Sequence, residues 1–227
     1  MSSIQHNADR LEKFRYELKI PLDQVQFIEF KHYLTQLGLY PATLFPRRQI
    51  NSVYFDTYDL NDYVDNVSGI ADRCKTRLRW YNNDITRLTL EIKIKKNKAS
   101  YKESLKLENS SKHNPSIKQD IPKIMQDHKS SAEYVILQNV SPVLEVQYDR
   151  QYFLLSQDLR MTIDVNQKFR RLYPTPSKSF IKSPVYSVAE FKFPAHKRNS
   201  MQSLMRNIPF RLFRHSKYVI GMDTVAL

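Results

Sequence analysis

The chain has 227 residues, with three glycines, one cysteine and a formal net charge of +13. This length suits a single domain, here 1–227, that can bury a real core. The charge favours a polyanionic partner: nucleic acid, an anionic membrane or phosphate compounds. A lone cysteine excludes an internal disulfide and suits a reducing compartment. Three glycines are too few for the glycine-rich loops that cradle nucleotide phosphates, so side chains must hold any phosphate.

Neither a membrane span nor a signal peptide is evident in the sequence. No apolar run approaches the roughly 20 residues that cross a bilayer, and residues 1–10 lack the hydrophobic stretch of a signal peptide. We therefore expect a soluble, cytoplasmic protein.

The first predicted elements are a strand and a helix. Residues 11–20 end in a clean alternation that places Arg15, Glu17 and Lys19 on one face of a strand. Pro21 is then predicted to open a helix over 22–38, and Gly38 is a plausible end. Its apolar residues fall at helical spacing and predict packing on the outside of a sheet: Val25, Ile28, Leu34 and Leu37. A second strand is predicted over 49–57, followed by a locally helical connection over 58–68.

Two strands around a turn at 82–84 alternate between apolar and basic residues. In a strand, successive side chains point to opposite faces. One face therefore carries Arg73, Lys75, Arg77, Arg79, Glu91, Lys93 and Lys95, while the other includes Leu78 and Trp80. An ordinary solvated face is one interpretation, but the planar fork of arginine suits oxyanions. The apolar position of Trp80 predicts a core residue.

Convergence of several such faces would require an anion. Two like charges about 7 Å apart repel by about 2.4 kcal/mol at an effective dielectric of about 20. A few such pairs would rival the ~5–15 kcal/mol that stabilises a whole domain.

The rest of the chain continues in strands with irregular connections. After a strand over 102–107, a polar segment predicts a loop with short helices near 117–128 and 133–138. Further strands are predicted over 143–153, 159–165 and 185–193, a loop or hairpin over 169–184, and a helix beginning at 199. Arg150 shares its parity with Leu144, Val146 and Tyr148, which is wrong for a basic face. This requires either a bulge or a wrong face assignment.

Strands dominate, and their connections are mostly too short for parallel crossovers. The sequence therefore predicts an α+β, strand-dominated fold with an antiparallel barrel, because closure removes exposed edges. A barrel with a charged interior would be a tunnel.

Several motifs occur in an order that resembles a known family. They are Arg15-x-Glu17-x-Lys19, Ser52-Val53-Tyr54-Phe55-Asp56-Thr57, Arg77-x-Arg79-Trp80-Tyr81, Glu91-x-Lys93, Arg160-x-Thr162-x-Asp164, Glu190-Phe191-Lys192 and Ser216-Lys217-Tyr218. Together they resemble the VTC (vacuolar transporter chaperone) catalytic domain, the polyphosphate-polymerase branch of the triphosphate tunnel metalloenzymes. The resemblance runs from about Arg15 to the C-terminus.

The resemblance implies an eight-stranded antiparallel tunnel with flanking helices. It also implies transfer of the terminal phosphate of ATP onto a growing polyphosphate chain, with Mn²⁺ or Mg²⁺. Carried over by motif, the catalytic residues would be Arg77, Arg79, Lys93 and Arg160. The substrate-binding residues would be Lys19, Lys102, Arg150, Arg214, Ser216 and Lys217. Glu190 would be the metal ligand, since carboxylate oxygen suits these hard cations.

Alternatives remain open at this point. Glu190 could instead form an ion pair with Lys192, and Glu17, Glu91 and Glu145 are further candidate ligands or charge balancers. The protein could be a triphosphatase on the same scaffold, or a non-catalytic module that binds polyphosphate or nucleic acid, although we expect no specific nucleic-acid partner.

The sequence also departs from relatives of the family. Arg15 stands where the wider superfamily has the first glutamate of Glu-x-Glu-x-Lys. The phosphate-sensing domain and membrane segment of eukaryotic members are not evident in this sequence. Any membrane association would therefore need a separate membrane protein.

Overall fold

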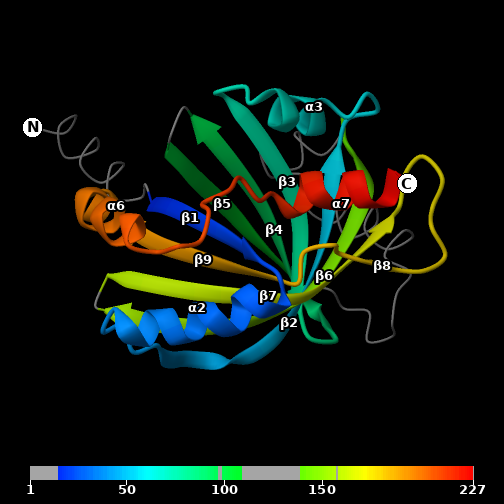
Figure 1. Ribbon diagram of the computed structural model, residues 1–227. Helices are drawn as coiled ribbons and strands as arrows, with labels where there is room; N and C mark the ends of the chain where they lie inside the picture. The colour runs from blue at the N-terminus through cyan, green and yellow to red at the C-terminus, as the bar shows by residue number, and fades with distance from the viewer. Residues whose placement is uncertain (1–14, 97–98, 109–138, 157, 227) are drawn as a thin grey trace, which may run out of the picture.

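The computed structural model describes residues 15–96, 99–108, 139–156 and 158–226 (Figure 1). Its strands are β1 (Arg15–Leu22), β2 (Ala42–Asp56), β3 (Arg73–Tyr81), β4 (Asp84–Lys96), β5 (Ala99–Glu108), β6 (Ser141–Ser156), β7 (Leu159–Arg171), β8 (Ile181–Lys182) and β9 (Ser187–Pro194). Its helices are α2 (Gln24–Gln36), α3 (Asn61–Ser68), a short 3₁₀ turn η1 (Ala195–Lys197), α6 (Arg198–Arg206) and α7 (Lys217–Ala226). The helices predicted near 117–128 and 133–138 lie outside the described residues.

One antiparallel sheet contains every described strand. Eight strands follow the order β1-β9-β7-β6-β2-β3-β4-β5, and β8 pairs with β7 beside this path. The predicted strand-dominated, antiparallel class is thus confirmed. The sheet bends into a deep curve (Figure 1), and its edge strands β1 and β5 approach each other. Among the described strands no backbone pairing joins these two edges, so the sheet curls without closing into a complete barrel.

The inner face of this curved sheet, here called the basic face, collects the charged side chains. Paired residues of neighbouring antiparallel strands point to the same side. The pairs Lys19↔Glu190, Thr162↔Glu190 and Arg150↔Asp164 therefore place these residues on one face. By the same registers the basic face also includes Glu17, Ser52, Tyr54, Arg73, Lys75, Arg77, Arg79, Glu91, Lys93, Lys95, Lys102, Arg160 and Lys192.

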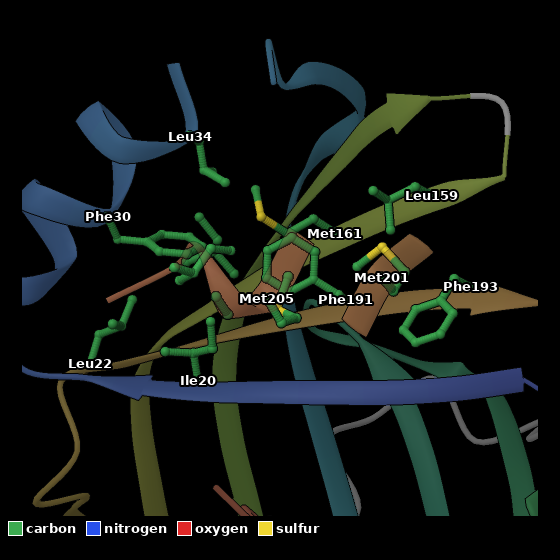
Figure 2. Close-up of a cluster of buried hydrophobic side chains, with 13 residues drawn as sticks. Ile20, Leu22, Phe30, Leu34, Leu159, Met161, Phe191, Phe193, Met201 and Met205 are labelled. Atoms are coloured by element: carbon green, nitrogen blue, oxygen red, sulfur yellow. The ribbon is translucent and has the colours of Figure 1, made fainter. Parts of the chain in front are cut away.

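The outer face is apolar and carries two hydrophobic clusters. In the first, α2 and α6 cover β1, β9 and β7, and Figure 2 shows Phe30 and Leu34 of α2 near Met161 and Phe191. The second follows the outer side of β2 to β5 and includes Trp80, only 6% exposed, which confirms it as a core residue. Burial of these side chains stabilises the fold by roughly 1.5–3 kcal/mol each. It therefore determines that the apolar face is the outer one and that the basic face lines the inside of the curve.

A third cluster corrects the predicted face of β6. Leu144, Val146 and Tyr148 lie on the same face as Arg150, since the pairing of β6 with β2 runs without a shift through these positions. The wrong assumption was that apolar and basic residues must lie on opposite faces. Here α7 covers the apolar end of the inner face, where its Tyr218 packs into the cluster. The register between β6 and β7 does shift within this stretch, but the extra residue lies in β7: Gln147 pairs with Lys168 and Asp149 pairs with Val165.

The predicted start of the first helix is also wrong. Pro21 belongs to β1, whose outermost position in the sheet tolerates a residue without an N–H. Asp23 then caps α2, because its side chain accepts a hydrogen bond from the Gln26 backbone N–H at 2.8 Å. Val25 and Ile28, predicted to pack inward, are 65% and 57% exposed.

Other boundaries differ from their predictions in the lengths of the strands. β2 begins at Ala42 and β7 continues to Arg171, while α3 and α6 confirm the helical segments predicted near 58–68 and 199. The sequence did not predict α7, whose burial depends on contacts with β6 and β7. No helix in the described residues is both long and apolar enough to cross a membrane.

Candidate functional site

Glu91 gathers three of the predicted site residues on the basic face. Its carboxylate accepts hydrogen bonds from Arg77 Nε and Lys102 Nζ, each at 2.6 Å, and Arg79 lies 3.5 Å away. Arg77 also donates to the Tyr54 hydroxyl at 3.0 Å. Burial alone would raise the pKa of Glu91, but Arg77 and Arg79 hold it well below its usual range. The predicted glutamate is therefore a charge balancer that positions these cations.

Asp164 is the centre of a second, more deeply buried group. Arg150 donates to both of its oxygens, with Nε–Oδ1 at 2.6 Å and Nη2–Oδ2 at 2.7 Å, and Lys217 donates to Oδ2. This bidentate geometry is the strong form of an arginine–carboxylate pair. Burial would raise the pKa of Asp164, but Arg150 and then Lys217 keep it well below its usual range. Asp164 thus brings Arg150 and Lys217 together on the basic face.

Two carboxylates lie close together on β1 and β9. Glu190 forms ion pairs with Lys192 at 3.0 Å and Lys19 at 3.5 Å, and Glu17 pairs with Lys93 of β4 at 2.8 Å. Burial raises the pKa of Glu190, but Lys19 and Lys192 bring it well below normal. The Glu17–Lys93 pair links the β1 side of the curve to the β4 side, which shows how far the sheet curls.

The segment before α7 completes this side of the site. The Phe213 backbone N–H donates to the Lys19 carbonyl at 3.0 Å, and Lys19 Nζ donates to the His215 carbonyl at 3.1 Å. The buried His215 ring lies 3.3 Å from Gln167. Burial, followed by the charge of Lys217, lowers the pKa of His215 to about 3. The imidazole is therefore neutral at physiological pH and adds no cation to the site.

A buried aspartate anchors α7 from the opposite side. Asp56 accepts hydrogen bonds from the backbone N–H groups of Asp62 and Tyr63, both at 2.9 Å, at the start of α3. It also accepts from the Tyr218 hydroxyl, and the Tyr218 ring stacks on Tyr54 with 5.2 Å between centroids. These contacts place Ser216 and Lys217, at the beginning of α7, against the basic face.

Lys75 also belongs to the site, although no binding or catalytic role was predicted for it from the sequence. Its Nζ donates to Ser216 Oγ at 2.8 Å. No carboxylate of the described residues forms an ion pair with it, in contrast to Arg77 and Lys93. The alternation of β3 had placed Lys75 on the basic face, so its parity was the available signal.

Two predicted residues lie at the margins of the site. Arg160 shares the basic face by its register with Lys192, but its side chain is exposed and joins no ion pair among the described residues. Arg214 is also exposed and lies near Gly69, because a Cβ added there would meet Arg214 Nη1 at 3.2 Å. Neither residue belongs to the buried ion pairs.

The resemblance implies a divalent cation, and the donor set fits one. No group of three His, Cys, Asp or Glu side chains in the described part of the chain could hold a metal ion. Mg²⁺ and similar ions, however, usually take one or two carboxylates and complete their shell with phosphates and water. Glu190 and Glu17 offer two such carboxylates. Thr162, paired with Glu190, has a buried hydroxyl without a hydrogen-bond partner in the described structure. Glu145 lies on the outer face with Arg170 and is no candidate.

Two solved structures are similar to this chain in fold. One is a candidate adenylate cyclase from Vibrio parahaemolyticus, with a TM-score of 0.53 and 13% identity, covering 92% of this chain and 97% of that chain. The other is a candidate adenylyl cyclase from Hippeastrum with a dominant triphosphatase activity. Its TM-score is 0.53 at 14% identity, and the match covers 92% of this chain and 95% of that chain. At such low identity they show the fold alone.

The family comparison is more specific. No curated protein sequence gives a significant match. The model of the family described as the VTC domain matches residues 14–226, nearly the whole chain. The chain therefore belongs to the VTC domain family.

Proposed function

We propose that this protein is a phosphotransferase that moves the terminal phosphate of ATP onto a growing polyphosphate chain. One observation carries the proposal: cations from strands far apart in the sequence converge on a single curved face and outnumber its carboxylates. The cations are Lys19, Arg77, Arg79, Lys93, Lys102, Arg150, Lys192 and Lys217, and the carboxylates are Glu17, Glu91, Asp164 and Glu190. Such a surface attracts and is suited to bind a polyanion.

Phosphoryl transfer mainly requires positioning and charge neutralisation. In the proposed reaction, a terminal oxygen of polyphosphate attacks the γ-phosphorus of ATP. The bond from that phosphorus to the β–γ bridging oxygen breaks, and ADP leaves. Arg77, Arg79 and Lys93 would grip successive phosphates, each charge-assisted bond contributing ~1.5–3 kcal/mol.

The carboxylates of the face would hold the cations in place before the substrate arrives. Glu91, for example, fixes Arg77 through a 2.6 Å hydrogen bond to Nε while other N–H groups of the guanidinium remain able to donate. Such preorganisation means that little rearrangement is needed when charge develops on the transferring phosphate.

Glu190, assisted by Glu17, would hold Mn²⁺ or Mg²⁺. A bound divalent ion would supply Lewis-acid polarisation of phosphate oxygens. Glu190 can bind the ion only if Lys19 and Lys192 leave it, and phosphate oxygens would then become the partners of these two lysines. Both lysines are partly exposed, with 24% and 29% of their side-chain surface accessible, which leaves them free to reorient.

A triphosphatase is the second candidate function. It would use the same residues with water in place of the phosphate acceptor. The triphosphatase activity of the Hippeastrum protein, which shares the fold, favours this candidate. A non-catalytic polyphosphate-binding module is a third, and would need only the cations.

The expected partners follow from this chemistry. They are ATP or another triphosphate and polyphosphate, with no specific nucleic acid. We further propose a cytoplasmic location, a single domain over 1–227 and association with a membrane through a separate membrane protein.

The test is incubation with ATP and Mn²⁺, with products resolved on a gel that separates polyphosphate by length. The polymerase predicts long chains together with ADP. Release of orthophosphate without chains would instead establish the triphosphatase. Triphosphate binding that persists in Glu190→Ala, with no turnover even in the parent protein, would establish the binding module.

A further inference from the structure

Lys75 differs from Arg77 and Lys93 on the basic face in having no carboxylate partner among the described residues. It lies in β3 opposite Lys93 of β4, and its Nζ donates to Ser216 Oγ at 2.8 Å. Lys93 has Glu17 at 2.8 Å, and Arg77 has Glu91 at 2.6 Å. Carboxylates already stabilise the charges of Lys93 and Arg77. An incoming anion would therefore stabilise a positive charge on Lys75 more than it would stabilise theirs.

The groups that face Lys75 are mostly cationic. They come from its own strand (Arg73 and Arg77), from β1 (Lys19) and from β4 (Lys93). One carboxylate faces it from α3, namely Asp62. Burial and the nearby Asp56 raise the pKa of Asp62 to about 7, so its negative charge is incomplete near neutral pH.

This environment disfavours a charged amine at Lys75. Burial is the largest cause that holds its pKa well below the usual range, and repulsion from Lys19 and Lys93 adds to it. A phosphate group placed among these cations would reverse the balance, because an opposite charge within about 4–6 Å favours the protonated form.

Ser216 is suited to share the same phosphate. Its Oγ accepts from Lys75 and, at 3.4 Å, from the Val219 backbone N–H in the first turn of α7. A hydroxyl can accept twice and still donate its own hydrogen. Ser216 can therefore donate to a phosphate oxygen while Lys75 binds a neighbouring one.

We propose that Lys75 and Ser216 form a further phosphate-binding pair, and that a phosphate group entering there brings a proton from solvent onto the Lys75 amine. The inference rests on the proposed function, and it adds a regulatory property: tri- and polyphosphate bind with proton uptake. Binding should therefore weaken as the pH rises.

Isothermal titration calorimetry with inorganic tripolyphosphate tests this pair directly. Titrations at pH 8 in two buffers of different ionisation enthalpy give the number of protons exchanged, and the comparison is between parent and variants. In Lys75→Met we expect proton uptake to fall by up to about one proton and affinity to fall by about tenfold, the loss of one modest charge-assisted contact. In Lys75→Arg, which is charged before binding, we expect affinity to persist while proton uptake falls by the same amount as in Lys75→Met.

Lys31→Met is the matched control, because Lys31 is an exposed lysine on α2 that packs over Phe27. It should leave both affinity and proton exchange unchanged. Equal proton exchange in the parent, Lys75→Met and Lys75→Arg would overturn the inference. If Lys75→Met does not fold, the arginine variant alone decides the outcome.

The result is separable from the proposed function. A parent protein that binds tripolyphosphate with Lys75-dependent proton uptake, yet forms no polyphosphate from ATP, would contradict the polymerase and support this pair. A parent protein that does not bind tripolyphosphate would overturn both.

Discussion

The Asp164 group and the Lys75–Ser216 pair lie on the same basic face but handle charge in opposite ways. Arg150 and Lys217 both contact one fully buried carboxylate, whereas Lys75 contacts a serine oxygen and is faced mostly by cations. Cations that already contact a buried carboxylate support the fold and gain less from a new anion. A basic side chain without a carboxylate partner gains more. The difference separates side chains that build the site from those that await a ligand.

The largest effect on stability should come from removing the negative charge of Asp164. Asp164→Asn leaves Arg150 and Lys217 buried without the carboxylate that they contact, and we expect a loss of about 3–5 kcal/mol in the free energy of unfolding. Urea denaturation measures it. The control is Asp149→Asn, which breaks an ion pair with Arg47 whose side chain is half exposed, and should cost at most about 1 kcal/mol. Equal losses in the two variants would contradict the comparison.

Removing a cation that faces the substrate should affect turnover more than folding. In Arg77→Ala we expect turnover to fall by about 10²–10³-fold, as for the loss of one transition-state donor. The fold should persist, because Glu91 keeps Lys102 at 2.6 Å and Arg79 at 3.5 Å. Polyphosphate formation and phosphate release from ATP with Mn²⁺ provide the measurement.

Arg170→Ala is the matched control for this variant. Arg170 donates to Glu145 on the outer face, so it reproduces an arginine–glutamate pair away from the site. Its turnover should equal that of the parent. Undiminished activity in Arg77→Ala would contradict the assignment of the basic face as the site of reaction.

A substitution of Glu190 should have a smaller effect, which weakens metal binding and strengthens binding of tripolyphosphate without metal. In Glu190→Gln the Mn²⁺ concentration that supports half-maximal turnover should rise at least about tenfold, since a candidate ligand is lost. Metal-free binding of tripolyphosphate should tighten, because the face loses one negative charge. Glu145→Gln on the outer face is the control. An unchanged metal titration in Glu190→Gln would exclude Glu190 as the ligand.

The smallest effect concerns the neutral His215. Its pKa of about 3 in the folded protein lies below the ordinary value near 6.5, so the unfolded chain binds the extra proton. Its contribution to stability is therefore present above pH 6.5 and is lost as the pH falls toward 3. The slope should approach 1.4 kcal/mol per pH unit, as an order-of-magnitude value. In His215→Gln the dependence of unfolding free energy on pH between 6.5 and 4.5 should be shallower by that amount. An imidazole that titrates near pH 6.5 by NMR would contradict this.

Much of the sheet was predictable because strand alternation is a local property. The period of two placed Lys19, Arg77 and Lys93 on one face before any contact was known, and the registers confirm that face. The period of two also holds in β6, where Leu144 and Arg150 share a side, but the expectation that apolar and basic residues occupy opposite faces failed there. A local pattern cannot show that a distant helix, α7, will cover part of an inner face.

By itself, the sequence determined the strand-dominated class, the basic face and the family motifs, since each depends on residue type and short-range spacing. Only the tertiary structure decided which cations have counter-charges and which do not. The Glu17–Lys93 pair, the Asp164 contact with Lys217 and the marginal position of Arg160 all depend on how far the sheet curls. Electrostatic partners are set by distance in space and by exclusion of water, and neither is encoded in the neighbouring residues of a strand.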